Sequence, residues 1–309
     1  MSEELAISVR GLRKSYGDFE AVRGLDFEVR NGEVFGLLGP NGAGKTTTIE
    51  ILEGIRQRTA GDVLVLGFDP DKQKQLLKDR IGVCLQATNL PAKIRVHEAL
   101  VLFGALYSRM LSPTDLLKRL QLWDKRDAFF ETLSGGQKQR LAIALGLIND
   151  PNLLFLDEPS TGLDPQVRLE IHSLIQDLRN EKRTILMTTH YIEEAERLCD
   201  RVAIVDAGKV IAIGSPRELM EKSAGKSTIE IECSVSLLGR AIPQWPEATD
   251  AKLADNPRRM VVHSTKPART LVEMIKWVES EGLELEDVHL SRPTLEDVFI
   301  ELTGKRLRD

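Results

Sequence analysis

The stretch of sequence that decides the fold reads Gly39-Pro40-Asn41-Gly42-Ala43-Gly44-Lys45-Thr46-Thr47. It fits the pattern G-x-x-x-x-G-K-[ST] at every position. An apolar run at 33–38 precedes it and is typical of a buried strand, and residues 47–53 can continue as a helix. The glycines let backbone N–H groups point inward, where the start of the helix adds positive potential. The sequence therefore predicts a strand, a loop and a helix that together bind a polyphosphate.

Two side chains of this loop have chemistry suited to a nucleoside triphosphate. Lys45 can reach the β- and γ-phosphates as a mobile cation, and the Thr46 hydroxyl can bind Mg²⁺. A glycine-rich turn in an ordinary α/β protein is the alternative explanation. The complete match and its strand-to-helix context favour the phosphate site.

The bulk composition is that of a soluble globular chain. With 309 residues, 42% of them hydrophobic and 29% charged, the chain can form one large or two ordinary domains, each with its own core. A formal charge of -5 disfavours a nucleic-acid binder that relies on phosphate neutralisation. The three cysteines are widely spaced, which suits reduced thiols in the cytoplasm. We find no signal peptide and no run long enough to span a bilayer, so we expect any membrane attachment to go through a partner.

Two residues near predicted strands are candidate site residues with competing explanations. Alternating apolar residues predict half-buried strands at 7–9 and 25–29, and Tyr16 lies between them. Its ring could stack on a purine, although filling a strand edge explains it equally well. Gln86 ends a further β-rich run at 81–86. Since ligands gather at the carboxyl ends of parallel strands, Gln86 could reach the metal or water, and a plain loop amide is the alternative.

From Val96 to about Asp150 the pattern changes to helix, which predicts a helical insert between strands of the sheet. Near its end lies Leu133-Ser134-Gly135-Gly136-Gln137, followed by a helical run. Ser134 can cap that helix, and the two glycines leave its first N–H groups uncovered. The chain therefore has a second helix start suited to an anion, unless this segment is only a flexible cap.

The apolar run at 153–156 is typical of a central parallel strand and places Asp157 and Glu158 at its carboxyl end. Two adjacent carboxylates there are costly unless a cation and a proton transfer account for them. Asp157 suits the Mg²⁺ shell, and Glu158 is placed to orient and deprotonate an attacking water. A helix cap or a surface turn is the weaker alternative.

Two further residues follow the acidic pair along the chain. Asp164 precedes Pro165 and can N-cap a helix, and capping alone would explain it. His190 ends another strand-like run at 184–189, where it could meet the γ-phosphate and hold the water and Glu158 in place. A hydrogen-bonded histidine without a catalytic role is the common alternative at such a position.

In this order the motifs resemble those of an ATP-binding cassette (ABC) ATPase, and the resemblance covers roughly residues 5–220. The matches are Gly39–Thr46 with Walker A, Gln86 with the Q-loop, 133–137 with the LSGGQ signature, 153–158 with Walker B and its catalytic glutamate, 160–164 with the D-loop, and His190 with the switch histidine. Tyr16 falls where the family stacks adenine. The resemblance implies an α/β P-loop NTPase cassette over residues 1–224, with a RecA-like core, an antiparallel β subdomain and a helical subdomain at about 88–150.

The same resemblance implies the cofactors, the roles of the site residues and the partners. ATP and Mg²⁺ are the expected cofactors, with the metal near Thr46, Gln86 and Asp157. Catalysis is expected from Lys45, Gln86, Glu158 and His190. In this family two cassettes join head to tail, so each ATP lies between the Tyr16 and Gly39–Thr47 side of one copy and Ser134, Gly135, Gly136, Gln137 and Asp164 of the other. We therefore expect a second copy of the chain and an integral membrane permease as partners, and no nucleic acid.

Residues 225–309 have a pattern of strands and one amphipathic helix, which predicts a small C-terminal α/β domain. Its end, residues 292–304, resembles the tail of the daunorubicin-resistance branch of ABC ATPases, which serve exporters of drugs, lipids or related cargo. The leading hypothesis is therefore the ATPase subunit of an exporter at the cytoplasmic face of the membrane. A soluble cassette ATPase acting on ribosomes or nucleic acid is the alternative, and the acidic balance and single cassette count against it.

Overall fold

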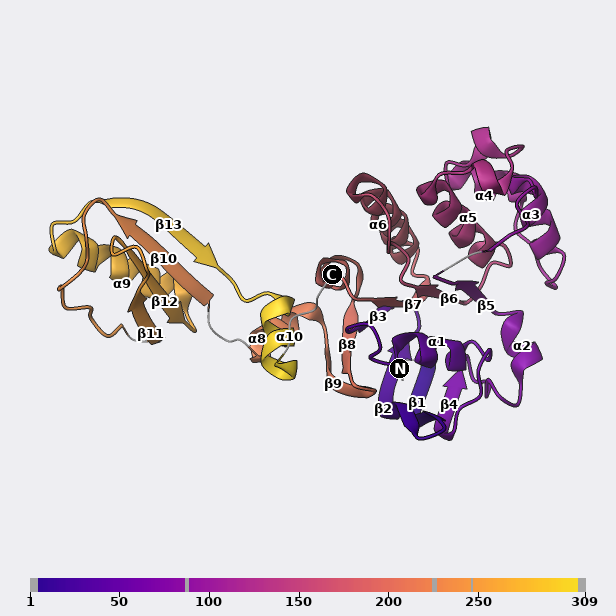
Figure 1. Cartoon of the computed structure of the whole chain (residues 1–309), viewed down its shortest axis with the longest axis horizontal. Helices are drawn as coiled ribbons and strands as arrows, with labels where there is room; N and C mark the ends of the chain where they lie inside the picture. The colour runs from indigo at the N-terminus through magenta and orange to yellow at the C-terminus, as the bar shows by residue number, and fades with distance from the viewer. Residues whose placement is uncertain (1–4, 87–88, 224–226, 246, 305–309) are drawn as a thin grey trace. The chain divides into compact units, whose positions relative to one another are not determined.

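The computed structural model of the chain describes residues 5–86, 89–223, 227–245 and 247–304. These residues form two compact units, which divide between Pro216 and Arg217. Figure 1 shows the elements of both units. The first unit contains all the motifs from the phosphate loop to His190.

A six-stranded sheet in the order β5-β6-β7-β3-β8-β9 forms the centre of the first unit. Its strands are β3 (Val34–Leu38), β5 (Ile81–Cys84), β6 (Leu153–Asp157), β7 (Thr184–Thr189), β8 (Arg201–Asp206) and β9 (Lys209–Gly214). All run parallel except β9, which pairs with β8 as an antiparallel hairpin. Every residue of β3, β6 and β7 is buried, as expected for parallel strands covered on both faces. The carboxyl ends of these three strands therefore meet at one edge.

A three-stranded antiparallel sheet lies in the same unit, in the order β2-β1-β4. It contains β1 (Leu5–Tyr16), β2 (Phe19–Arg30) and β4 (Ala60–Val65). Phe27 of β2 stacks on Phe35 of β3, with ring centroids 5.6 Å apart. One continuous core of buried side chains joins the two sheets. The strands predicted at 7–9 and 25–29 are confirmed, and both extend further than the apolar alternation indicated.

Helices flank these sheets. Four of them are α1 (Lys45–Leu52), α2 (Lys74–Lys78), α6 (Pro165–Asn180) and α7 (Ile192–Leu198). The insert between β5 and β6 contains α3 (Val96–Gly104), α4 (Pro113–Arg119), the 3₁₀ turns Trp123–Lys125 and Phe130–Thr132, and α5 (Gly135–Leu147). In Figure 1 the helices of the insert lie on the opposite side of β6 and β7 from the antiparallel sheet. The helical insert predicted from the sequence is confirmed.

The last helix of the insert contacts the central sheet backbone to backbone. A Cβ atom added to Gly82 of β5 would lie 1.8 Å from the carbonyl oxygen of Gly146 in α5. No side chain fits in that space, so the close approach of helix and strand requires glycine at position 82; a Cβ on Gly146 would lie 3.2 Å from Leu154 Cδ1 and 3.3 Å from Val83 O, which is tight. Asn149 adds a hydrogen bond of 2.9 Å from its side-chain nitrogen to Ile81 O. The position of α5 is thereby fixed relative to β5.

The second unit is a four-stranded antiparallel sheet with a helix packed against it. The sheet has the order β11-β12-β10-β13. The elements are α8 (Pro216–Ser223), β10 (Ser227–Cys233), β11 (Ala248–Leu253), β12 (Arg259–Ser264), α9 (Pro267–Ser280), β13 (Leu285–Ser291) and α10 (Leu295–Thr303). Its core includes Ile229, Met260 and Met274, and Trp245 packs edge-on against Trp277 with centroids 6.0 Å apart. The predicted α/β character of this region is confirmed, whereas β11 and α10 were not predicted.

We expect Gly82→Ala to destabilise the first unit severely, because the new methyl group overlaps backbone atoms that cannot rotate away. The expected loss in free energy of unfolding is about 3 kcal/mol or more. Gly135→Ala is the matched control, since a Cβ there would meet only Leu163 Cδ2 at 3.7 Å. Chemical denaturation of both variants provides the measurement. Equal stability of the two would contradict the close contact of α5 with β5.

Candidate active site

The phosphate loop connects the end of β3 to the start of α1. Gly44 is the N-cap of α1 with φ 97°, and a Cβ there would lie 2.7 Å from Ala21 O. A Cβ on Gly39 would lie 2.1 Å from Val205 O. Only glycine fits these two positions. No side chain caps the N-terminus of α1, so the first N–H groups of the helix remain available to an anion.

Lys45 is buried beneath this loop. Its Nζ donates hydrogen bonds to Gly39 O at 2.7 Å and Pro40 O at 3.1 Å, and lies 3.5 Å from Glu158 Oε1. The side chain is 4% exposed. Burial lowers the pKa of the Lys45 ammonium, and the negative charge of Glu158 opposes this effect. A phosphate bound at the loop would be a stronger partner for this cation than the neutral loop carbonyls, because a phosphate is negatively charged.

Asp157, at the end of β6, lies next to the loop. Its Oδ1 is 3.4 Å from the hydroxyl oxygen of Thr46 and accepts a 2.5 Å hydrogen bond from Thr188. Burial raises the pKa of the Asp157 carboxyl, a cost that a bound cation would offset. Magnesium is held in proteins by one or two carboxylate or hydroxyl oxygens together with substrate phosphates and water. Thr46 and Asp157 provide that donor set.

Glu158 lies at the centre of the candidate site. Its Oε2 is 3.3 Å from Gln86 Nε2, 3.0 Å from Thr161 Oγ1 and 3.2 Å from His190 Nδ1. The His190 contact is close, but the ring nitrogen makes no hydrogen bond within the described residues. The structure thus brings Lys45, Gln86 and His190 to one carboxylate. Gln86 contacts Glu158 here, and its role as a metal ligand stays a prediction.

The backbone at Glu158 is unusual for a non-glycine residue. Its φ of 48° lies in the left-handed region, which costs energy for a residue with a Cβ. The Glu158 N–H donates a 3.0 Å hydrogen bond to the Thr188 hydroxyl, which in turn donates to Asp157. Thr188 therefore connects the two acidic residues and supports the turn between them. Sequence reasoning missed this threonine, because in the sequence it is one more polar residue of a strand.

The signature segment forms the N-terminus of α5, as the sequence predicted. Ser134 accepts a hydrogen bond from Gln137 N at 3.3 Å, and Gln137 Oε1 accepts one from Ser134 N at 3.0 Å. A Cβ on Gly136 would lie 2.4 Å from Val167 Cγ1, so this helix start packs closely on α6. Within the described parts of the chain, no hydrogen bond or ion pair connects 134–137 with the phosphate loop. The two helix starts predicted to bind anions are therefore not connected to each other by the described contacts of one copy.

Tyr16 and Asp164 complete the set of predicted site residues. Tyr16 is 40% exposed, and Lys14 Nζ and Arg56 Cζ lie 5.1 and 5.2 Å from the centroid of its ring. Part of the ring therefore remains open for stacking. Asp164 occupies the N-cap position of α6 with Pro165 after it, but its side chain makes no capping hydrogen bond. The explanation that capping alone accounts for Asp164 is wrong, because the carboxylate is not used for it.

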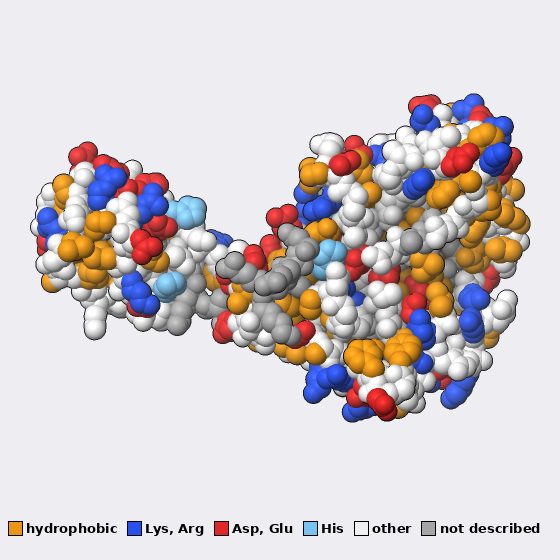
Figure 2. Space-filling view, in the orientation of Figure 1, with side chains coloured by type: hydrophobic (Ala, Val, Ile, Leu, Met, Phe, Trp, Pro, Cys, Tyr) orange, Lys and Arg blue, Asp and Glu red, His pale blue; other side chains and the backbone are white. Residues whose placement is uncertain are grey.

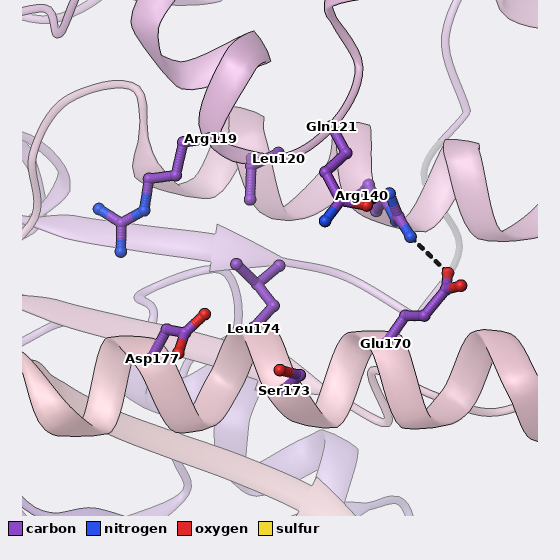
Figure 3. Close-up of a pocket in the computed structure, with 8 residues that line it drawn as sticks. All are labelled: Arg119, Leu120, Gln121, Arg140, Glu170, Ser173, Leu174 and Asp177. Carbon is purple, nitrogen blue, oxygen red and sulfur yellow. Dashed lines mark hydrogen bonds and ion pairs between the residues drawn. The ribbon is translucent and has the colours of Figure 1, made fainter.

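A small pocket lies between the helical insert and α6. Its volume is 160 Å³, and Figure 3 shows the residues that line it, among them Arg119 and Arg140 facing Glu170 and Asp177. Arg140 of α5 forms an ion pair with Glu170 and donates a 2.8 Å hydrogen bond to Gln121. None of the predicted site residues lines this pocket. The pocket lies at the interface where charged side chains connect the insert to α6.

Glu53 is an additional buried acid that sequence reasoning missed. It ends α1 as the C-cap residue, is 2% exposed, and neither carboxyl oxygen has a hydrogen-bond partner within the described residues. Burial, with smaller contributions from the charges of Asp157 and Glu50, raises the pKa of the Glu53 carboxyl to about 9. Glu53 is therefore protonated in the folded protein near neutral pH.

A family model and full-length relatives among known proteins agree on one family for this chain. The family model described as ABC transporter matches residues 22–161. The chain is 38% identical over 306 residues to the daunorubicin resistance ATP-binding protein DrrA3 of Streptomyces coeruleorubidus, covering 97% of this chain and 96% of that protein. It is 40% identical over 317 residues to Nod factor export ATP-binding protein I of Ralstonia nicotianae, covering 98% and 95%.

Solved structures of ATP-binding cassettes are also similar to this chain. One is a cassette in a dimeric, post-hydrolysis state with bound ADP and Pi. It matches with a TM-score of 0.61 and 25% identity, over 68% of this chain and 98% of that one. The arrangement of sheets and helices is therefore that of a known nucleotide-binding fold.

We expect Glu53→Gln to change how stability depends on pH. The unfolded carboxyl titrates near 4.5 and the folded one near 9, so between these values the folded state holds a proton that the unfolded state releases. Stability contributed by this group is full below pH 4.5 and declines as pH rises toward 9. The variant should remove that decline and gain on the order of 3 to 5 kcal/mol at pH 7 to 8.

Denaturant unfolding from pH 5 to 8.5 measures this effect. Glu131→Gln, at an exposed position of the insert, is the control and should unfold like the unsubstituted protein. A Glu53→Gln protein whose stability falls with pH as steeply as the unsubstituted protein would contradict the protonated state of Glu53.

Proposed function

The chain belongs to the ABC transporter family of ATP-binding proteins, and on that premise we propose that it is the ATP-hydrolysing subunit of an exporter, acting as a dimer beneath a separate membrane permease. One observation carries the proposal. Glu158 lies within 3.5 Å of atoms of Lys45, Gln86 and His190, at the sheet edge where the phosphate loop starts. This arrangement supports a general base beside the terminal phosphate of a bound nucleotide.

In the proposed reaction Glu158 accepts a proton from the water that attacks the γ-phosphate. Gln86 and His190 both contact Glu158 Oε2, so they can hold the water and the carboxylate in one geometry. Lys45 stabilises the charge that develops on the phosphate oxygens. Thr46 and Asp157 would hold Mg²⁺, which neutralises phosphate charge when bound.

The dimer follows from the separation of the two helix starts. The N-terminus of α5 has uncovered N–H groups and glycines, but within the described residues its contacts run to α6 rather than to the phosphate loop. A second copy can bring that segment to the γ-phosphate, completing the site. The similarity to a cassette solved as a dimer with ADP and Pi supports this arrangement. Because the signature glycines favour the γ-phosphate, its loss on hydrolysis weakens the dimer.

The helical insert offers a surface for the permease. Exposed hydrophobic side chains are concentrated there and beside Gln86: Leu85, Val101, Leu102, Leu106, Met110 and Phe129. Leu106 is 73% exposed. Figure 2 shows hydrophobic side chains gathered at the edge of the first unit over α3. An apolar surface of this kind is typical of a protein contact, and we assign it to the cytoplasmic helices of the permease.

The cargo class comes from the relatives. Those reported above are named for daunorubicin resistance and for Nod factor export, so we propose outward transport of a drug, lipid or related amphiphile. No bilayer-spanning helix occurs in the part of the chain that the structure describes. As the ATPase subunit of the proposed exporter, the protein would lie at the cytoplasmic face of the membrane, attached through the permease.

The rival function is a soluble cassette ATPase that acts on ribosomes or nucleic acid. Co-expression with the permease followed by membrane sedimentation distinguishes the two. Recovery with membranes only when the permease is present supports the exporter, whereas recovery with ribosomes or nucleic acid would favour the rival.

We expect Glu158→Gln to bind ATP, to lose ATP turnover by at least about a hundredfold, and to accumulate as an ATP-bound dimer, because the base is removed while the phosphate contacts remain. Sedimentation velocity with Mg²⁺ and ATP provides the measurement. Lys45→Ala is the control and should stay monomeric because it cannot hold the triphosphate. The shared-site proposal is wrong if Glu158→Gln remains monomeric both alone and with the permease.

We propose that residues 225–309 form an accessory domain that is not needed for ATP hydrolysis. The second unit has its own hydrophobic core, which supports independent folding. Deleting 225–309 should leave ATP turnover within about twofold of the full chain, since no predicted site residue lies there. Steady-state turnover and thermal unfolding test this. Aggregation of the truncated chain would instead show that the two units stabilise each other.

A further inference from the structure

A buried carboxylate on α7 lies directly behind the candidate active site. Glu194 is 1% exposed and accepts hydrogen bonds on both oxygens. Oε1 accepts from the Ser160 hydroxyl and lies 2.9 Å from His172 Nε2, and Oε2 accepts a 2.5 Å hydrogen bond from Thr189 Oγ1. Four side chains from four segments of the chain therefore meet at one charge.

Two of these partners flank residues assigned to hydrolysis. Ser160 follows the base Glu158 by two residues, and Thr189 directly precedes His190. The Thr189 hydroxyl also accepts a 2.9 Å hydrogen bond from Tyr191 N, which fixes the backbone on the far side of His190. Glu194 thus connects the segment that follows Glu158 to the segment that contains His190, and it fixes the position of one relative to the other.

Two side chains of α6, one turn apart, contact this region. His172 reaches Glu194, and Arg168, one turn earlier, places its guanidinium 4.3 Å from the centroid of the Tyr191 ring. The Tyr191 ring in turn packs against His190 at 4.1 Å between centroids. The segment that carries His190 is therefore connected to α6 through both a buried hydrogen-bond cluster and an aromatic contact.

The cluster is built to hold a negative charge. Burial raises the pKa of the Glu194 carboxyl, but the hydrogen bonds from His172, Ser160 and Thr189 outweigh this, and the pKa lies below its ordinary value. An ionised carboxylate that accepts several hydrogen bonds orients each donor more strongly than a neutral group does. Loss of the carboxylate would leave Ser160 and His172 without this buried partner, and the Thr189 hydroxyl with only a 3.5 Å hydrogen bond to Tyr191 O.

We propose that Glu194 is a positioning residue for ATP hydrolysis, which acts through Ser160 and Thr189 to hold Glu158 and His190 at the distance that the reaction requires. The inference rests on the proposed roles of Glu158 and His190. Glu194 does not touch the phosphate loop through any hydrogen bond among the described residues, so it should affect turnover and not nucleotide affinity.

The test compares steady-state ATP hydrolysis and ATP binding in full-length variants. Glu194→Ala removes all three hydrogen bonds, and Glu194→Gln keeps an acceptor with a similar shape. Glu193→Gln, an exposed acid on the same helix, is the matched control. Thr189→Val removes one donor with little change in volume and carries the test if Glu194→Ala does not fold.

We expect Glu194→Ala to lower kcat by roughly tenfold or more while KM and Kd for ATP stay within about twofold. Glu194→Gln should fall between Glu194→Ala and the unsubstituted protein, and Glu193→Gln should not differ from the latter. Thr189→Val should lower kcat on its own and should lower it less in the Glu194→Ala background, because the two changes share the Thr189–Glu194 hydrogen bond while Thr189→Val also removes the acceptor of Tyr191 N.

Two outcomes would overturn the inference. One is an unchanged kcat in Glu194→Ala or, if that protein does not fold, in Thr189→Val. The other is a parallel loss of ATP affinity and turnover, which indicates a general structural defect. If the unsubstituted protein hydrolyses ATP and Glu158→Gln does not, these outcomes count against Glu194 alone. A failure of the unsubstituted protein to hydrolyse ATP would instead count against the proposed function.

Discussion

The contact between Lys45 and Glu158 is the interaction on which the candidate active site depends. Their charged atoms lie 3.5 Å apart, and both side chains are almost fully buried. Asp157 is a third buried ionisable group at the same sheet edge. Buried charges are stable only where nearby groups compensate them, so the charges at this sheet edge are compensated by their contacts with one another. In the proposed reaction a triphosphate competes with Glu158 for Lys45, and the carboxylate freed from the ammonium is then the base that hydrolysis uses.

Much of this arrangement could be predicted from the sequence, because it depends on local pattern and strand ends. The uninterrupted apolar runs before Gly39 and Asp157 indicated buried parallel strands, and parallel strands present their carboxyl ends at one edge. That rule was enough to expect His190 and Glu158 near each other, and they lie 3.2 Å apart. Ser134 at the start of α5 was equally predictable, because an N-cap is a property of a few neighbouring residues.

Other features depend on contacts that no local pattern encodes. Thr188 and Glu194 are ordinary polar residues in the sequence, and their roles appear only once β7 and α7 lie beside the acidic turn. Glu53 lies at the end of a helix, where a solvated acid is the usual expectation, and its burial becomes evident only in the folded chain. The edge strand β11 lacks a clear apolar alternation, because an irregularity in its pairing with β12 between Ala248 and Asp250 interrupts the two-residue period. In each case tertiary packing decided the outcome.

The backbone contact between Gly82 and Gly146 has a consequence for how cassettes of this kind can diversify. A contact without side chains cannot be adjusted by repacking, so α5 keeps its place on the sheet whatever happens around it. The outer helix α3 carries no such restriction, and its exposed apolar residues Val101 and Leu102 can change one at a time. One catalytic scaffold can therefore change the outer surface of the insert by drift, without disturbing the helix that, in the proposed dimer, would complete the neighbouring copy's nucleotide site.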